Sequence, residues 1–103
     1  MKIIYQLGYK VDTFPVDIPI VDCRVIRNPY SPTKSKDQME REVRQSSVFM
    51  ILVLDSIKLL ENYNSVIIAC SYGRHRSGEV VKETVRILSM LNIKVEVIKG
   101  IRG

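Results

Sequence analysis

Residues 70–77 (Cys-Ser-Tyr-Gly-Arg-His-Arg-Ser) gather reactive and cationic side chains into one short segment. The segment holds the only histidine, one of the two cysteines and two arginines. It lies between an apolar run, residues 66–69, and an amphipathic stretch, residues 79–91, which predict a buried strand and a helix. A strand-to-helix turn directs free backbone N–H groups and the positive end of the helix dipole at one point. The segment therefore predicts a cradle for phosphate or another anion at the carboxyl end of a strand.

The first interpretation of this loop is enzymatic. Cys70 and Arg76, with Ser77 next, form the Cys-x5-Arg pattern of cysteine-dependent phosphatases. In such enzymes a thiolate at a helix N-terminus attacks phosphorus while the arginine holds the phosphate oxygens. Ala69 stands where these enzymes usually carry a histidine, and no nearby aspartate is an obvious general acid, Asp22 being a speculative candidate.

Two other interpretations remain open. In the second, the backbone amides of residues 73–77 and the side chains of Arg74, Arg76 and Ser77 bind an anion without reacting with it, and the histidine donates a hydrogen bond or acts as an acid or base. In the third, the loop is a polar turn that contains a core thiol and a satisfied histidine. One histidine and two separated cysteines do not supply a metal site.

The composition is that of an ordinary globular domain. Hydrophobic residues make up 46% of the chain and charged residues 26%, so a single domain over residues 1–103 can bury a core. The net charge of +5 is compatible with a phosphorylated ligand or RNA, but it is too small to indicate nucleic acid alone. Cys23 and Cys70 lie in apolar sequence and are expected to be reduced thiols of a cytoplasmic protein. The longest apolar run, residues 48–54, is too short to span a membrane, and the N-terminal residues do not predict a signal peptide.

Four strands and three helices are predicted around the loop. The strands are expected at residues 2–7, 20–26, 65–69 and 93–98, and the helices at residues 37–45, 48–61 and 77–91. Their order predicts a single α/β domain with a mainly parallel sheet. The middle helix should be largely buried because apolar residues cover nearly all its sides. The solvent-facing side of the last helix is expected to carry Glu79, Lys82, Glu83 and Arg86.

Side chains at the ends of these elements predict local contacts. Asp37 is expected to cap the first helix, and Ser46 or Ser47 the second. Asp22 and Arg24 are two residues apart on a predicted strand, so they share a face. They form either a structural ion pair at the end of the sheet or a wall of the anion site.

The loop resembles the Cys-Thr-Gly-Gly-x-His-Arg-Ser signature of the C-terminal domain of the RapZ family, the RNase adapter proteins. Two upstream segments are similar as well. Residues 7–10 resemble a Phe-Gly-(Phe/Tyr)-Lys turn of that family, and residues 21–30 resemble its Asp-x-Arg-Phe-Leu-x-Asn-Pro-(Tyr/His) segment. The three segments keep their order and approximate spacing, so the resemblance covers nearly the whole chain.

The resemblance implies an α/β module similar to a sugar-phosphate-binding subdomain of phosphofructokinase. It implies binding of glucosamine-6-phosphate, contact with structured RNA, presentation of that RNA to an endoribonuclease, and assembly into a homo-oligomer, with no cofactor. The implied anion site consists of Ser71, Gly73, Arg74, His75, Arg76 and Ser77, with Lys10, Arg24 and Asn28 as neighbours. The resemblance therefore favours a binding domain for a phosphorylated sugar or nucleotide over phosphatase chemistry, and it leaves two roles open for Cys70, a nucleophile or a wall of the site.

Three departures from the family distinguish this chain. Tyr72 stands where the family has glycine, which narrows the loop or adds a stacking surface for a base. The family's Gly-rich nucleotide-binding domain has no counterpart in residues 1–103, which suggests a free-standing small domain. Few basic residues follow the last predicted strand. RNA binding is thus less well supported by the resemblance than phosphate binding.

Overall fold

A four-stranded parallel sheet forms the centre of the fold. The computed structural model describes residues 1–101, and its strands are β1 (Lys2–Gly8), β2 (Ile20–Asp22), β3 (Ser65–Cys70) and β4 (Val95–Lys99). The strand order is β2-β3-β1-β4, and every pairing is parallel. The predicted α/β fold with a mainly parallel sheet and three helices is therefore confirmed.

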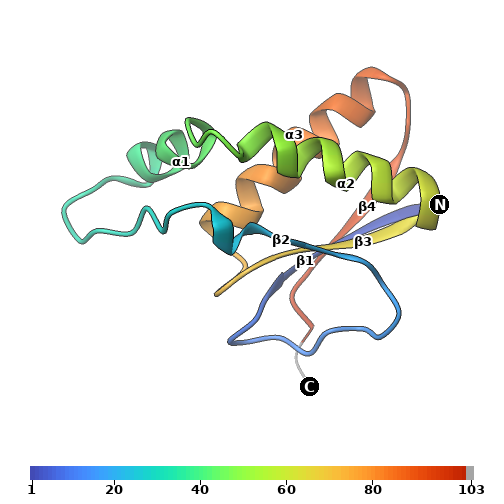
Figure 1. Cartoon of the computed structure of the whole chain (residues 1–103), viewed down its shortest axis with the longest axis horizontal. Helices are drawn as coiled ribbons and strands as arrows, with labels where there is room; N and C mark the ends of the chain where they lie inside the picture. Colours follow the sequence, from blue (N-terminus) through green and yellow to red (C-terminus); the bar gives the residue numbers. More distant parts are fainter. Residues whose placement is uncertain (102–103) are drawn as a thin grey trace.

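Three helices lie on one side of this sheet (Figure 1). They are α1 (Lys36–Arg44), α2 (Phe49–Tyr63) and α3 (His75–Met90). Helices α2 and α3 pack against the strands, and α1 packs against α3. On β3, Val66, Ile68 and Cys70 belong to the larger core cluster, which α2 and α3 share. No helix among residues 1–101 has the length and apolar character needed to cross a bilayer.

The opposite face of the sheet is covered by a loop, residues 9–19, which crosses below it in Figure 1. There Leu7, Ile67 and Ala69 form a second, smaller cluster with Tyr5, Tyr9, Phe14, Ile18 and Ile101. Both faces of β3 are thus buried, which explains why its sequence is continuously apolar instead of alternating. The Asp12 carboxylate fastens this cover, because it accepts hydrogen bonds from the N–H groups of Gly8 (2.8 Å) and Ile101 (3.1 Å).

The predicted helix caps were wrong. Ser35 caps α1, accepting from the N–H of Gln38 at 3.2 Å while the Gln38 side chain accepts from the N–H of Ser35, and Asp37 lies inside the first turn. Helix α2 begins at Phe49 after Val48, with no side-chain cap. Helix α1 therefore begins at the reciprocal capping box of Ser35 and Gln38, and not at the single acidic residue Asp37.

Helix α2 is also less buried than predicted. Met50, Ile51 and Leu54 are 44%, 57% and 58% exposed. Helix α2 packs against the sheet and α3 with one side only, and no described residue covers its outer side. The apolar residues on that outer side are therefore exposed, contrary to the prediction.

The predicted solvent position of Glu79 on α3 was wrong as well. Glu79 is 3% exposed and pairs with Arg44 of α1 at 2.7 Å and with Lys82 at 3.0 Å. Burial by itself would raise the pKa of this carboxyl, but hydrogen bonds from Arg44 and Lys82 outweigh burial and lower the pKa. Glu79 therefore joins α1 to α3, a contact that helical periodicity alone did not show.

Several elements end elsewhere than predicted. Strand β2 stops at Asp22, whose carboxylate accepts from the N–H of Arg24 (3.0 Å) and starts a 3₁₀ turn, η1 (Cys23–Val25). Helix α3 begins at His75, two residues before its predicted start. Asn92 adopts a positive φ of 59° after α3, so β4 begins only at Val95. The earlier start of α3 matters most, because the last three residues of the predicted loop, residues 75–77, form the first turn of the helix.

Candidate anion-binding site

The candidate site lies where β3 passes into α3. Only residues 71–74 connect the two elements. This connection is fastened to the end of β1, because the N–H groups of Tyr9 and Lys10 donate to the carbonyls of Cys70 and Ser71, both at 2.9 Å. The loop is therefore held in place by the central strand of the sheet.

Two glycines allow this close approach. Gly73 has a φ of +70°, and a Cβ there would lie 2.8 Å from the carbonyl carbon of Leu7. A Cβ on Gly8 would lie 2.5 Å from the carbonyl carbon of Tyr72. The Gln6 side chain adds a hydrogen bond from its Nε2 to the Gly73 carbonyl at 2.8 Å. A side chain at either glycine would push the loop away from the sheet.

The Cys70 thiol lies at the base of the loop, 3% exposed. Its Sγ is 3.2 Å from the Oγ of Ser77, which is fully buried. Burial alone would raise the pKa of this thiol, but hydrogen bonding from the Ser77 hydroxyl and from the N–H groups of Ser77, Arg74 and Gly73 outweighs burial and lowers the pKa. These hydrogen bonds therefore act on the Cys70 sulfur and favour negative charge on it.

Arg76 adds a fixed positive charge beside these donors. It is 9% exposed, and its guanidinium donates to the Ile26 carbonyl at 3.2 Å and to the Ser71 hydroxyl at 3.3 Å. Within residues 1–101 no ion pair joins it to a carboxylate. Because a buried cation normally has an anionic partner, this arrangement suits an external anion.

A cavity of about 360 Å³ opens over the thiol. Its lining residues are Asn28, Tyr30, Cys70, Tyr72, Arg74, His75 and Arg76. Two of these side chains are permanently cationic, and none is acidic. The cavity therefore collects positive charge and hydrogen-bond donors without a carboxylate to neutralise them.

A wider hollow of about 990 Å³ runs along α3 on the side of α1 and β4. Its lining holds the carboxylates of Glu40 and Glu79 together with five basic residues, Lys36, Arg74, Lys82, Arg86 and Lys99. Lys82 and Arg86 already pair with Glu79 and Glu83, at 3.0 Å and 2.6 Å. An anion there would meet these carboxylates, which the smaller cavity lacks. The smaller cavity is therefore the better anion site.

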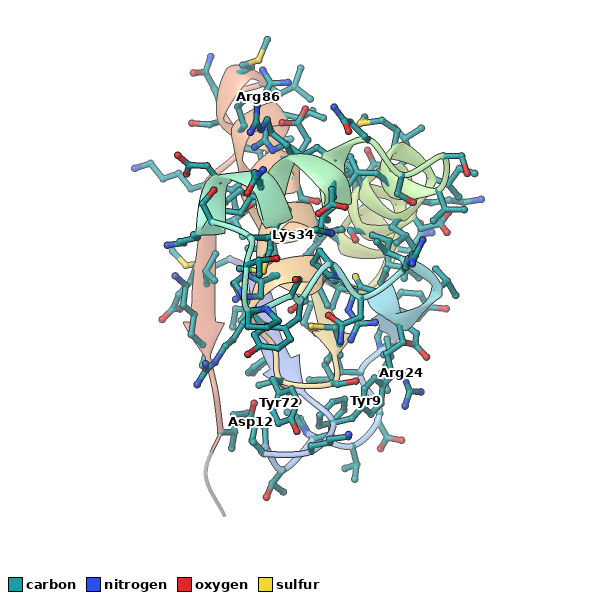
Figure 2. All side chains as sticks on the ribbon, turned by 90° about the vertical axis from the view of Figure 1, so that its left-hand side faces the viewer. Tyr9, Asp12, Arg24, Lys34, Tyr72 and Arg86 are labelled. Carbon is teal, nitrogen blue, oxygen red and sulfur yellow. The ribbon has the colours of Figure 1, made fainter. Side chains whose placement is uncertain are left out.

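The structure brings some of the predicted neighbours to this cavity and not others. Asn28 lines it, whereas Lys10 lies just outside, with its Nζ 5.4 Å from the centre of the Tyr72 ring. Arg24 instead pairs with Asp22 at 2.8 Å and stacks its guanidinium 3.8 Å from the Tyr9 ring centre (Figure 2). Of the two alternatives for this pair, the ion pair at the end of the sheet is the one observed.

Sequence reasoning did not select Tyr30 as a site residue. Its signal was present in the Asn-Pro-Tyr run of residues 28–30, where the proline stiffens the segment that carries the ring. Asp22 does not line the cavity, and its hydrogen bonds with Arg24 lower the pKa of its carboxyl. Asp22 is therefore a poor general acid.

No protein-family model, curated protein or solved structure matches this chain. The RapZ resemblance stays a prediction, and functional inference rests on the geometry of the site.

Proposed function

We propose that this protein binds the phosphate group of a phosphorylated small molecule in the cavity above Cys70. The observation that carries the proposal is the buried Arg76, which no carboxylate pairs within residues 1–101 and which lines the cavity beside Cys70, a thiol whose pKa is lowered by hydrogen bonding. The Ile26 carbonyl holds this guanidinium in place, and a guanidinium next to a helix N-terminus suits a phosphate dianion.

The surrounding elements support this proposal. Helix α3 runs for 16 residues from His75, so the positive end of its dipole points at the cavity. Arg74, exposed at the mouth, extends the positive wall outward, and the half-buried His75 lies next to it in the lining. A phosphate would lie over the helix N-terminus, with Arg76 beside it and Arg74 near the entrance.

The proposal is tested by calorimetric titration with inorganic phosphate, glucosamine-6-phosphate, ribose 5-phosphate and nucleoside monophosphates. Arg76→Ala should weaken binding by about 1.5–3 kcal/mol, because it removes a charge-assisted contact. Arg86→Ala is the matched control, since Arg86 pairs with Glu83 further along α3 and does not line this cavity. Absence of binding by every phosphate compound, or equal affinity of the Arg76→Ala protein, would reject the site.

A second candidate function, phosphate ester hydrolysis, is favoured by the lowered pKa of Cys70 and by the Ser77 hydroxyl next to its sulfur. The thiolate would attack phosphorus, and the ester P–O bond would break. The leaving oxygen would take a proton from His75, which lines the same cavity. Water would then attack the phosphocysteine and give a proton back to His75, the S–P bond would break, and free phosphate and the Cys70 thiolate would be released.

This second candidate predicts turnover of p-nitrophenyl phosphate that is lost in Cys70→Ser. Cys23→Ser is the control, because Cys23 is buried and does not line the cavity. A wild-type protein that binds phosphate and releases no p-nitrophenol would restrict the site to binding.

A further inference from the structure

We infer that the ligand of this cavity is a phosphate monoester that carries a flat aromatic ring, as nucleoside monophosphates and aryl phosphates do, and not a simple sugar phosphate. The inference rests on the proposed phosphate site and concerns the group attached to the phosphate. Its basis is the pair of tyrosines in the cavity wall, Tyr30 and Tyr72.

Both rings are unusually exposed for large aromatic side chains. Tyr30 is 67% exposed and Tyr72 is 56% exposed, so neither is part of the core. They belong to separate segments, the loop after η1 and the loop after β3, and yet line the same cavity. Aromatic rings presented in this way are stacking surfaces, and each stacked base contributes roughly 1–3 kcal/mol in other proteins.

Tyr72 is held in position from two sides. Its main chain packs against Gly8 so closely that a Cβ on that glycine would meet it at 2.5 Å. The ammonium of Lys10 lies over the ring, 5.4 Å from its centre, and occupies one face. In Figure 2 Tyr72 lies below the helices, at the same end of the molecule as Tyr9. The ring is therefore a supported platform, with more than half of the residue open to a ligand.

The cavity offers few acceptors to a ligand that depends on sugar hydroxyl groups alone for its contacts. Sugar hydroxyl groups donate hydrogen bonds, and their usual acceptors are carboxylates and amide oxygens. No described residue of the lining is Asp or Glu, and the Oδ1 of Asn28 already accepts from the N–H of Tyr30 at 3.1 Å. A planar ring needs no such acceptors, because the tyrosine faces and the cation of Arg74 can contact its π surface.

The cavity also has room for more than the phosphate. Its volume of about 360 Å³ lies within the roughly 300–1,000 Å³ of pockets that hold whole small molecules. With the phosphate at the N-terminus of α3, the remaining space lies toward Tyr30 and Tyr72.

The test compares four ligands by calorimetry: AMP, phenyl phosphate, ribose 5-phosphate and inorganic phosphate. AMP or phenyl phosphate should bind at least about fivefold more tightly than ribose 5-phosphate, because only these two can stack. Tyr72→Leu should reduce that preference by at least about fivefold, whereas Tyr72→Phe should keep it. Tyr30→Leu provides a second variant with the same expected loss of preference.

The outcomes separate this inference from the proposed function. Tighter binding of AMP than of phenyl phosphate assigns the ring to a nucleotide, and the reverse assigns it to an aryl phosphate. Equal affinity for AMP, phenyl phosphate and ribose 5-phosphate overturns the inference and leaves the phosphate site standing. Failure of all four ligands to bind rejects the phosphate site itself.

Discussion

Cys23 and Cys70 occupy similar places in the fold, but their thiol pKa values are shifted in opposite directions. Each is a buried thiol at the carboxyl end of a strand, β2 and β3, and the register pairs Asp22 with Ala69 just before them. Burial raises the pKa of Cys23 to about 12, and the neighbouring Cys70 and Asp22 add to the rise. The pKa of Cys70 is lowered, although burial alone would raise it.

The difference lies in the backbone that continues each strand. After Cys23 the chain makes a three-residue 3₁₀ turn, η1, too short to direct several donors at one sulfur. After Cys70 a tight loop enters a long helix, and the hydroxyl and N–H groups there outweigh burial. The pKa of a buried thiol therefore depends on how many hydrogen-bond donors the neighbouring backbone directs at its sulfur.

The largest expected effect comes from Gly73→Ala. An L-residue at its positive φ costs about 1–2 kcal/mol, and the contacts of the new Cβ with Leu7 and Gly8, at 2.8 Å and 2.9 Å, bring the expected loss of stability to about 3 kcal/mol. Displacing the loop should also remove hydrogen-bond donors from the Cys70 thiol, so that burial raises the pKa of Cys70 as it does that of Cys23. Urea unfolding and the pH dependence of iodoacetamide labelling measure the two effects.

Gly78→Ala is the matched control for that change. Gly78 lies in the first turns of α3, and its new Cβ would meet only the end of the Gln6 side chain, at 3.4 Å. Alanine stabilises a helix interior relative to glycine by roughly 0.5–1 kcal/mol, so no loss is expected. If both variants lose the same stability, the close approach of the loop to β1 is not the contact that holds it.

The next largest effect is a loss of stability at alkaline pH that arises from Cys23. Its raised pKa means that the folded protein keeps a proton that the unfolded chain loses above about pH 9, so stability falls as pH rises toward 12. At pH 10.5 the loss is about 2 kcal/mol, from about 1.4 kcal/mol per pH unit. The unfolding free energy of wild type should therefore fall more steeply from pH 9 to 10.5 than that of Cys23→Ala.

Cys70 should show the opposite sign in the same experiment. Because its folded pKa is lowered, its contribution to stability is present above its unfolded pKa and is lost as pH falls through the folded value. The unfolding free energy of wild type should therefore gain a contribution from Cys70 as pH rises from the folded pKa toward pH 9, and Cys70→Ala should lack this gain. Parallel curves for the two alanine variants would show that the thiols do not differ.

The smallest effect is expected for Ser77→Ala, which removes one donor from the Cys70 sulfur. Stability should fall by about 1 kcal/mol for the lost hydrogen bond, and the pKa of Cys70 should rise. Ser56→Ala is the control, because Ser56 is also fully buried but donates to the Leu52 carbonyl, at 2.8 Å in α2. Both variants should lose similar stability, and only Ser77→Ala should slow labelling of Cys70 at neutral pH.

The sequence predicted the parts of this molecule that depend on local pattern. The buried run of β3, the parallel sheet and the convergence of polar groups after Cys70 all follow from residue type and spacing. The position of Asn28 beside the loop was expected from the RapZ resemblance, and Asn28 lines the cavity.

Features that depend on packing between distant segments escaped prediction. Glu79 is buried because α1 crosses α3, and Arg24 faces Tyr9 because η1 turns it away from the cavity. Tyr30 joins Tyr72 only once the loop after η1 folds over β3. RNA and endoribonuclease partners remain implied by the RapZ resemblance alone.

The central place of β1 has a consequence for the order in which the molecule can form. Ile3 pairs with Ser65, and Lys2 pairs with Val95, so the first strand of the domain to be synthesised meets its neighbours among the last. Contacts this distant along the chain make folding slow compared with that of helical bundles. Since the loop after β3 is fastened to the end of β1, the anion cradle takes shape only when β1 has paired with β3, more than 60 residues further along the chain. Assembly of the site and pairing of these two central strands are then one event.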